Sequence, residues 1–106
     1  MPSQHMQTGQ VGEDIACRVL SRRGYEIIER NWRCRAGEID IVARDGACWA
    51  FIEVKTRHKQ APELAEEALT QRKAQRLMLL AQTYLNEARL ENVDWRIDLM
   101  AIELGL

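Results

Sequence analysis

The stretch Gly37–Arg57, GEIDIVARDGACWAFIEVKTR, predicts two β-strands joined by a tight turn. β-branched and aromatic residues are frequent on both sides of Asp45-Gly46, and this dipeptide is a strong signal for a two-residue hairpin loop. A loop made of these two residues fixes the register of the hairpin. In that register Asp40 lies opposite Phe51 and diagonal to Glu53, within reach of a side-chain contact.

The predicted hairpin has two unlike faces, because side chains alternate along a strand. One face is charged at one end and aromatic at the other, and it carries Glu38, Asp40, Val42, Trp49, Phe51, Glu53 and Lys55. The other face is wholly apolar and carries Ile39, Ile41, Ala43, Ala50, Ile52 and Val54. The apolar face needs a covering layer, so we expect helices packed on this sheet.

The segments around the hairpin supply those helices. Residues 9–23 have helical spacing of apolar side chains, with Thr8 as a candidate N-cap and Gly24 as the residue that ends the helix. Residues 61–90 predict a second helix, in which Pro62 suits the first position and a break near Thr70 is possible.

Two further strands complete the order of elements. Residues 25–32 predict a strand before the hairpin, and residues 93–104 predict a closing strand with Arg96 and Asp98 on one side. The predicted order is αβββαβ. This is an α/β fold with a mixed sheet flanked by helices, in one domain spanning residues 1–106.

Composition and charge favour a soluble cytoplasmic protein. No apolar run approaches the length of a membrane span, and the N-terminus lacks a secretory signal. Cys17, Cys34 and Cys48 are odd in number and far apart, which favours reduced structural thiols over disulfides or zinc. The formal net charge is -1, yet most basic residues lie in four short clusters, so a basic face is compatible with the total.

Asp40, Glu53 and Lys55 form the candidate site on the charged face. Two carboxylates that converge favour a divalent cation, and oxygen ligands suit Mg²⁺ or Mn²⁺ better than zinc. A lysine beside them can orient a water or offset the charge that develops on a phosphate. The residues alone leave a second interpretation open, in which these side chains form salt bridges on a solvated face.

Several segments carry a resemblance to a known family. The pairing of GEID (37–40) with EVK (53–55) across a hairpin resembles the Asp…Glu-x-Lys site of the PD-(D/E)xK nuclease superfamily, although Ile39 stands where that motif usually has proline. More narrowly, the chain resembles the small bacterial endonuclease-like family often called YraN, in the Holliday-junction-resolvase-like branch. The segments that carry this resemblance are GQVGEDIACRVL, GYEIIERNWRCRAGEIDIVARDG, FIEVKTR, EALTQRKAQRLMLLAQTYL and WRIDLMAI.

The resemblance implies roles for individual residues. Asp40 and Glu53 match metal ligands, with the Val54 carbonyl as a possible third, and Lys55 matches the catalytic lysine. Glu13 matches a glutamate of the first helix in the resolvase-like branch, and Lys73 or Gln71 matches a helical position that assists the site. The candidate phosphate contacts are Arg57, Arg30, Arg33 and Arg35.

The function expected from this resemblance is an endonuclease that requires Mg²⁺ or Mn²⁺ and cleaves structured or branched DNA. A homodimer is suggested by the resolvase resemblance, and no membrane partner is expected. The alternative is an inactive adaptor that keeps the nuclease fold and binds nucleic acid or a protein partner. The near-neutral charge and the small size of the chain motivate that alternative.

Overall fold

The computed structural model describes residues 4–58 and 71–105 of the chain. Its elements follow the predicted αβββαβ order: α1 (Gln4–Arg22), β1 (Glu26–Cys34), β2 (Gly37–Asp45), β3 (Cys48–His58), α2 (Gln71–Glu87) and β4 (Trp95–Leu104). The predicted helical residues 61–70, with Pro62 and Thr70, lie outside the described residues. Within the described part of the chain, neither helix is long and apolar enough to cross a membrane.

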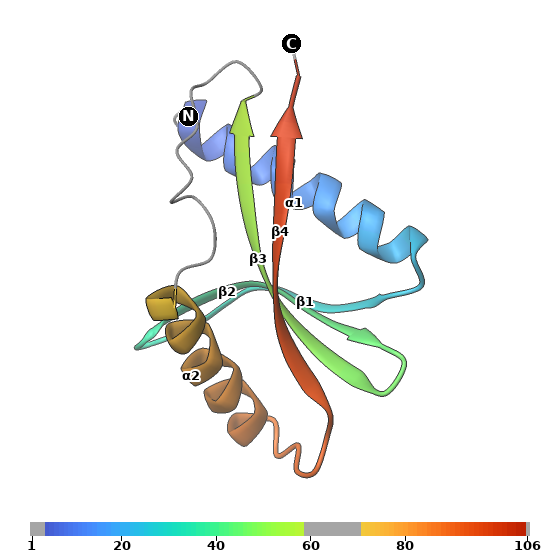
Figure 1. Cartoon of the computed structure of the whole chain (residues 1–106), viewed down its shortest axis with the longest axis vertical. Helices are drawn as coiled ribbons and strands as arrows, with labels where there is room; N and C mark the ends of the chain where they lie inside the picture. Colours follow the sequence, from blue (N-terminus) through green and yellow to red (C-terminus); the bar gives the residue numbers. More distant parts are fainter. Residues whose placement is uncertain (1–3, 59–70, 106) are drawn as a thin grey trace.

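The four strands form one mixed sheet in the order β1-β2-β3-β4. The first two pairings are antiparallel, and β4 returns to lie parallel to β3. The sheet is strongly twisted. Figure 1 shows the β1–β2 pair and the upper half of the β3–β4 pair spreading away from a common crossing point.

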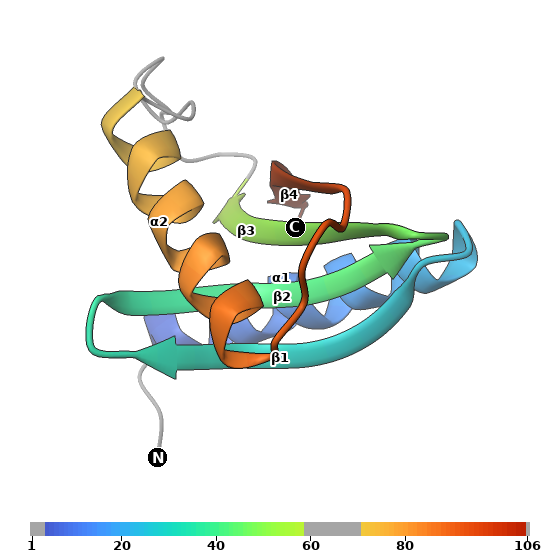
Figure 2. The same cartoon turned by 90° about the horizontal axis from the view of Figure 1, so that it is seen from below.

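The helices cover opposite faces of the sheet, as Figure 2 shows from below. Under α1 lies a core cluster of Ala16, Leu20, Ile41, Ala43, Ala50, Ile52 and Ile102. Under α2 lies a second cluster of Ile39, Val42, Phe51, Leu77, Leu80, Ala81, Tyr84 and Leu85. Tyr84 is central to the second cluster, because its ring packs edge-on against Trp32 and Phe51 at centroid distances of 5.3 and 5.6 Å.

The hairpin loop consists of Gly46 and Ala47, so the predicted loop of Asp45 and Gly46 was wrong by one residue. Asp45 pairs with Cys48, and the register moves by two along the partner strand. Gly46 has a φ of 62° at the first central position of the turn, which is where a type II′ turn requires a positive value. A shift of two residues does not by itself move side chains to the other face, and the observed register, continued past Ile41–Ile52, brings Asp40 level with Glu53 instead of diagonal to it.

The alternation of faces breaks at one level of the β1–β2 pair. Ile39 was predicted to share a face with Ile41, but Ile41 belongs to the α1 cluster and Ile39 to the α2 cluster, so that prediction was wrong for Ile39. Asn31 of β1 lies between the pairs Arg30–Ile41 and Trp32–Ile39 and has a φ of 55°. This left-handed residue marks a local irregularity of β1, at the level where the paired residues Trp32 and Ile39 join the α2 cluster.

Helix α1 begins earlier than predicted and ends as predicted. Thr8 lies inside the helix and is therefore not its N-cap. At the other end Gly24 has a φ of 92°, and the backbone N–H of Tyr25 donates to the carbonyl of Leu20 at 3.0 Å. These features form the glycine-terminated helix end that the sequence predicted.

Arg96 ties β4 to the hairpin at the end of the sheet away from Asp40. Its Nε donates to Asp98 at 2.9 Å, so the predicted shared side of these two residues is confirmed. The same guanidinium lies 3.5 Å from Asp45, donates to the hydroxyl of Tyr25, and stacks over the ring of Tyr25. One cation therefore connects β4, the end of β2 and the residue that precedes β1.

Gly12 sets the distance between α1 and the sheet. It is buried against Thr56 of β3, and a Cβ at this position would lie 1.8 Å from Thr56 Oγ1 and 2.8 Å from Thr56 Cβ. A methyl group cannot occupy that space unless the helix moves away from β3. Glu13 follows Gly12 in the chain, so the close approach also places Glu13 against the sheet.

Gly12→Ala is expected to lower the free energy of unfolding by about 1–3 kcal/mol, because the added methyl group overpacks the helix–sheet contact. The measurement is urea unfolding followed by circular dichroism. Gly9→Ala is the matched control on the same helix, where a Cβ would meet nothing within 4 Å. The control is expected to raise stability by about 0.5–1 kcal/mol, and a similar gain for Gly12→Ala would contradict the close approach.

Candidate functional site

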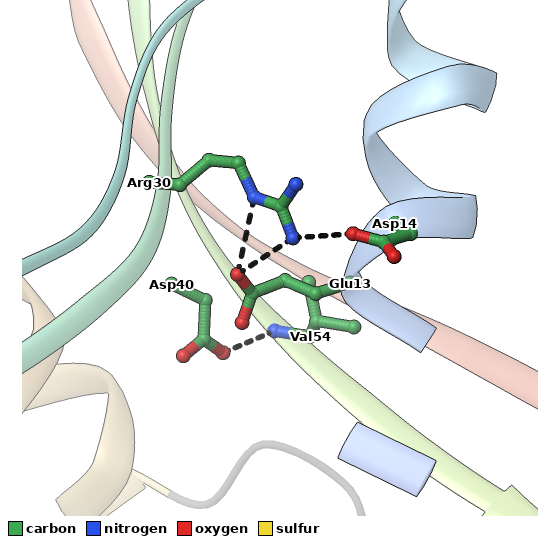
Figure 3. A network of polar contacts seen from close by, with 5 residues as sticks. All are labelled: Glu13, Asp14, Arg30, Asp40 and Val54. Carbon is green, nitrogen blue, oxygen red and sulfur yellow. Dashed lines mark hydrogen bonds and ion pairs between the residues drawn. The ribbon is translucent and has the colours of Figure 1, made fainter. Parts of the chain in front are cut away.

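Asp40 occupies the point where β2 leaves β3. Backbone pairing between these strands ends at Ile41–Ile52, and beyond it the backbone N–H of Val54 donates to Asp40 Oδ2 at 2.7 Å (Figure 3). The side chain of Asp40 thus takes the place of a β2 carbonyl. The N–H of Val54 stays satisfied while the two strands separate.

The pKa of Asp40 is raised to about 6, chiefly because burial disfavours the charged carboxylate. The hydrogen bond from Val54 lowers the pKa, while the neighbouring carboxylates Glu13, Glu53 and Glu38 raise it further. The carboxylates of Glu13, Glu53 and Glu38 therefore repel negative charge on the partly buried Asp40. A bound cation would offset this repulsion and stabilise the charged form of Asp40.

Glu53 lies on β3 with its side chain 26% exposed. Its Oε2 is buried and accepts no hydrogen bond from any residue in the described ranges, although Lys73 Nζ of α2 lies 3.6 Å away. The structure thus brings predicted Lys73 to predicted Glu53. Lys55, two residues further along β3, is half-buried.

Glu13 reaches toward the same region from α1. Its Oε1 accepts from Arg30 Nε and Nη2 at 3.3 and 3.2 Å, and Arg30 Nη2 also donates to Asp14 at 2.8 Å (Figure 3). Glu13 and Asp40 line one cavity. Arg30, a candidate phosphate contact in the sequence, is held by two carboxylates of α1.

The remaining predicted binding residues lie around this region at different depths. Arg33 is 77% exposed even though its Nε donates to Glu38 at 2.7 Å. Arg35 lies exposed in the β1–β2 turn, and Gln71 lies exposed at the start of α2. Arg57 is half-buried near the end of β3.

The donor set consists of carboxylates. Among residues 4–58 and 71–105, no group of three or more His, Cys, Asp or Glu side chains is arranged to hold a metal ion. Asp40 and Glu53 are two carboxylates on adjacent strands, and one or two carboxylates are what Mg²⁺ typically takes from a protein. Magnesium or manganese at these two residues remains a prediction.

Three residues near the site were not singled out from the sequence. Asn31 and Gln10 line the cavity beside Asp40, and Arg76 of α2 lies against Gly37, where a Cβ would meet its Nη2 at 3.0 Å. Asn31 lies among the arginines of one basic cluster but is itself uncharged, and Gln10 belongs to no charged motif, so neither amide was marked. Arg76 belongs to one of the four basic clusters, QRKAQR at residues 71–76, but its contact with the start of β2 depends on tertiary packing.

Asp40→Asn is expected to raise the free energy of unfolding by about 1–2 kcal/mol at pH 8 and to leave it nearly unchanged at pH 4. The folded protein holds the Asp40 proton up to about pH 6, above the ordinary value of about 3.9. More protons are therefore bound to the folded state between these values, so stability falls as pH rises through them. Asparagine keeps an acceptor for Val54 and removes the titration.

The measurement for Asp40→Asn is urea unfolding at both pH values. Asp94→Asn, an exposed acid before β4, controls for the general loss of one charge. An equal effect of Asp40→Asn at pH 4 and pH 8 would show that Asp40 titrates normally.

Comparison with known proteins identifies the family. A family model described as "Uncharacterised protein family UPF0102" matches residues 12–102. A UPF0102 protein of Roseiflexus castenholzii is 48% identical over 107 aligned positions, which cover 100% of this chain and 86% of that protein. One from Chloroflexus aurantiacus is 50% identical over 103 positions, covering 96% and 83%. These matches span nearly the whole chain, which therefore belongs to the UPF0102 family.

Proposed function

We propose that this chain is a divalent-metal-dependent endonuclease that hydrolyses phosphodiester bonds in structured or branched DNA. The observation that carries the proposal is the buried Oε2 of Glu53, which accepts no hydrogen bond from any described residue and lies on the strand beside Asp40. The αβββαβ order and the positions of Asp40, Glu53 and Lys55 support a place in the PD-(D/E)xK nuclease superfamily.

The residues at this point suit a hard divalent cation. Asp40 gives one carboxylate oxygen to Val54 and keeps the other, and Glu53 has an oxygen without a hydrogen bond among the described residues. Magnesium or manganese bound by these two side chains would relieve the repulsion that raises the pKa of Asp40. When bound, such a cation makes a coordinated water more acidic and withdraws charge from a phosphate.

The chain's own residues supply the remaining functions. Lys55 is proposed to orient the attacking water or to donate to the phosphate as negative charge develops on it. Lys73 offsets part of the charge of Glu53 from α2. Arg33 and Arg35 are exposed near the β1–β2 turn and are proposed to contact DNA phosphates. In a homodimer, two such sites would address the two strands of a branch.

Asp40→Asn and Glu53→Gln are each expected to abolish Mn²⁺ binding measured by calorimetry. Lys55→Met is expected to keep Mn²⁺ binding and to lower the cleavage of branched DNA by about 10²–10⁴-fold, as loss of one proton-transfer or charge-stabilising group does. Glu26→Gln is the matched control, because Glu26 lies on the same sheet, 65% exposed and paired with Arg44.

Two results would overturn the proposal. The first is the absence of Mn²⁺ and Mg²⁺ binding at millimolar concentration, with or without DNA. The second is unchanged cleavage in Asp40→Asn, which would assign the activity to a contaminant. Metal-independent DNA binding that is equal in all variants, without any cleavage, would support the inactive adaptor instead.

A further inference from the structure

A polar cavity of about 440 Å³ adjoins the proposed catalytic site. It lies between the N-terminal half of α1 and the strands β1, β2 and β3, and it is lined by Gly9, Gln10, Glu13, Arg30, Asn31, Arg33, Glu38, Asp40 and Val54. Asp40 and Val54 lie in its wall, whereas Glu53, Lys55 and Lys73 are not among its lining residues. The cavity therefore adjoins the catalytic site and shares Asp40 with it.

We propose that this cavity receives one unpaired nucleobase of the DNA, next to the phosphodiester bond at Asp40. The inference rests on the proposed function, because it presumes that DNA is the ligand. It adds to the proposed function that this cavity selects the substrate. The chain would favour DNA with an unpaired nucleotide beside the cleavage point over continuous duplex.

The size of the cavity fits a single small planar group. Pockets for small organic ligands measure about 300–1,000 Å³, and this one lies at the lower end of that range. A duplex does not enter such a space. A base that leaves the helical stack does, and leaving the stack costs least where the base has no pairing partner.

The charges in the lining argue against simpler ligands. A free phosphate would meet the carboxylates of Glu13, Glu38 and Asp40, while a metal ion would meet the guanidiniums of Arg30 and Arg33. Two of these acids are already engaged, because Glu13 accepts from Arg30 and Glu38 accepts from Arg33. A neutral polar group satisfies this lining better than an ion of either sign.

The hydrogen-bonding groups match the edge of a base. Gln10 and Asn31 each carry an amide that both donates and accepts, as the edges of nucleobases require. Neither amide has a hydrogen-bond partner among the side chains that the structure describes around it. The guanidinium planes of Arg30 and Arg33 add surfaces on which a base can stack.

The backbone of Asn31 supports a functional role for this position. Its φ of 55° is uncommon for a residue other than glycine, and such conformations are concentrated at functional sites. Asn31 lies at the level where β1 changes face, with Arg30 turned toward Glu13 of α1 and Trp32 packed in the α2 cluster. Asn31 lies between these two oppositely directed residues and lines the cavity.

The test measures DNA binding by fluorescence anisotropy in EDTA, so that it requires neither a metal nor cleavage. Three duplexes of one sequence are compared: fully paired, with one unpaired adenine, and with an abasic site in place of that adenine. The wild type is expected to bind the duplex with unpaired adenine about tenfold more tightly than the other two, since one stacked base contributes about 1–3 kcal/mol.

Asn31→Gly is the decisive variant, because glycine adopts the positive φ without strain and lacks the amide. It is expected to lose most of the preference for the unpaired adenine, and Gln10→Ala is expected to lose part of it. Asn92→Gly is the matched control, since Asn92 has a φ of 58° in the segment between α2 and β4. The control is expected to keep the tenfold preference.

Equal binding of the abasic and the adenine-containing duplex would overturn the inference, because flexibility rather than the base would then be recognised. Equal loss in Asn31→Gly and Asn92→Gly would overturn it as well. Absence of binding to all three duplexes would overturn the inference, because the cavity would then recognise no base without a metal; the endonuclease proposal would still be decided by Mn²⁺ binding and cleavage. A base preference in EDTA without any metal-dependent cleavage would reject the endonuclease proposal and leave the cavity assignment standing.

Discussion

The hydrogen bond from the Val54 backbone to the Asp40 carboxylate is the interaction on which the arrangement of the site depends. Without a partner from β2, the N–H of Val54 would either lose its hydrogen bond or keep the two strands together. The Asp40 side chain reaches further than a backbone carbonyl, so it accepts the hydrogen bond from Val54 while the two strands lie apart. The strands separate beyond Ile41–Ile52, and the space between them becomes available for polar groups from α1 and α2.

This separation explains why groups from four elements meet near Asp40. Glu13 approaches from α1 because Gly12 lets that helix lie against Thr56, and Lys73 approaches Glu53 from α2. Arg30 holds Glu13 in place from β1. Each charged side chain named here has an opposite charge nearby, yet Asp40 still carries a raised pKa. Burial is the main cause of that shift, and the carboxylates of Glu13, Glu53 and Glu38 add to it. A partly buried carboxylate beside other carboxylates is the physical basis for proposing a cation there.

The sequence predicted the architecture and most of the residues that lie close together. It did not predict details that depend on single backbone angles. The order of elements is confirmed, as are the glycine end of α1 and the common side of Arg96 and Asp98. The hairpin register was wrong because Asp45-Gly46 fits two kinds of turn, and only the φ of Gly46 in its actual position distinguishes them. The place of Ile39 was wrong because alternation presumes a regular pair of strands, whereas the β1–β2 pair has a register shift and a left-handed residue, Asn31, on β1.

The part of the candidate site that lies on one hairpin could be predicted from the sequence pattern. Asp40, Glu53 and Lys55 share a short hairpin, so their proximity follows from strand periodicity and one turn. The contact of Lys73 with Glu53 was suggested only by resemblance, since it joins β3 to α2, which lies within the crossover to β4, and depends on how that helix packs. The amides of Gln10 and Asn31 carry no such signal, because uncharged polar residues are common on any exposed strand or helix.

The parallel pairing of β3 with β4 has a consequence for how the chain is made. Trp49 pairs with Trp95, and His58 with Leu104, so one edge of β3 acquires its partner only after the whole crossover has been synthesised. During translation a ribosome-bound chain already contains the complete hairpin, while the apolar β3 edge remains open to strands of neighbouring molecules. Such an edge is a template for intermolecular pairing. The closing strand therefore removes this hazard only once it has been made, and until then the growing chain is exposed to intermolecular pairing along β3.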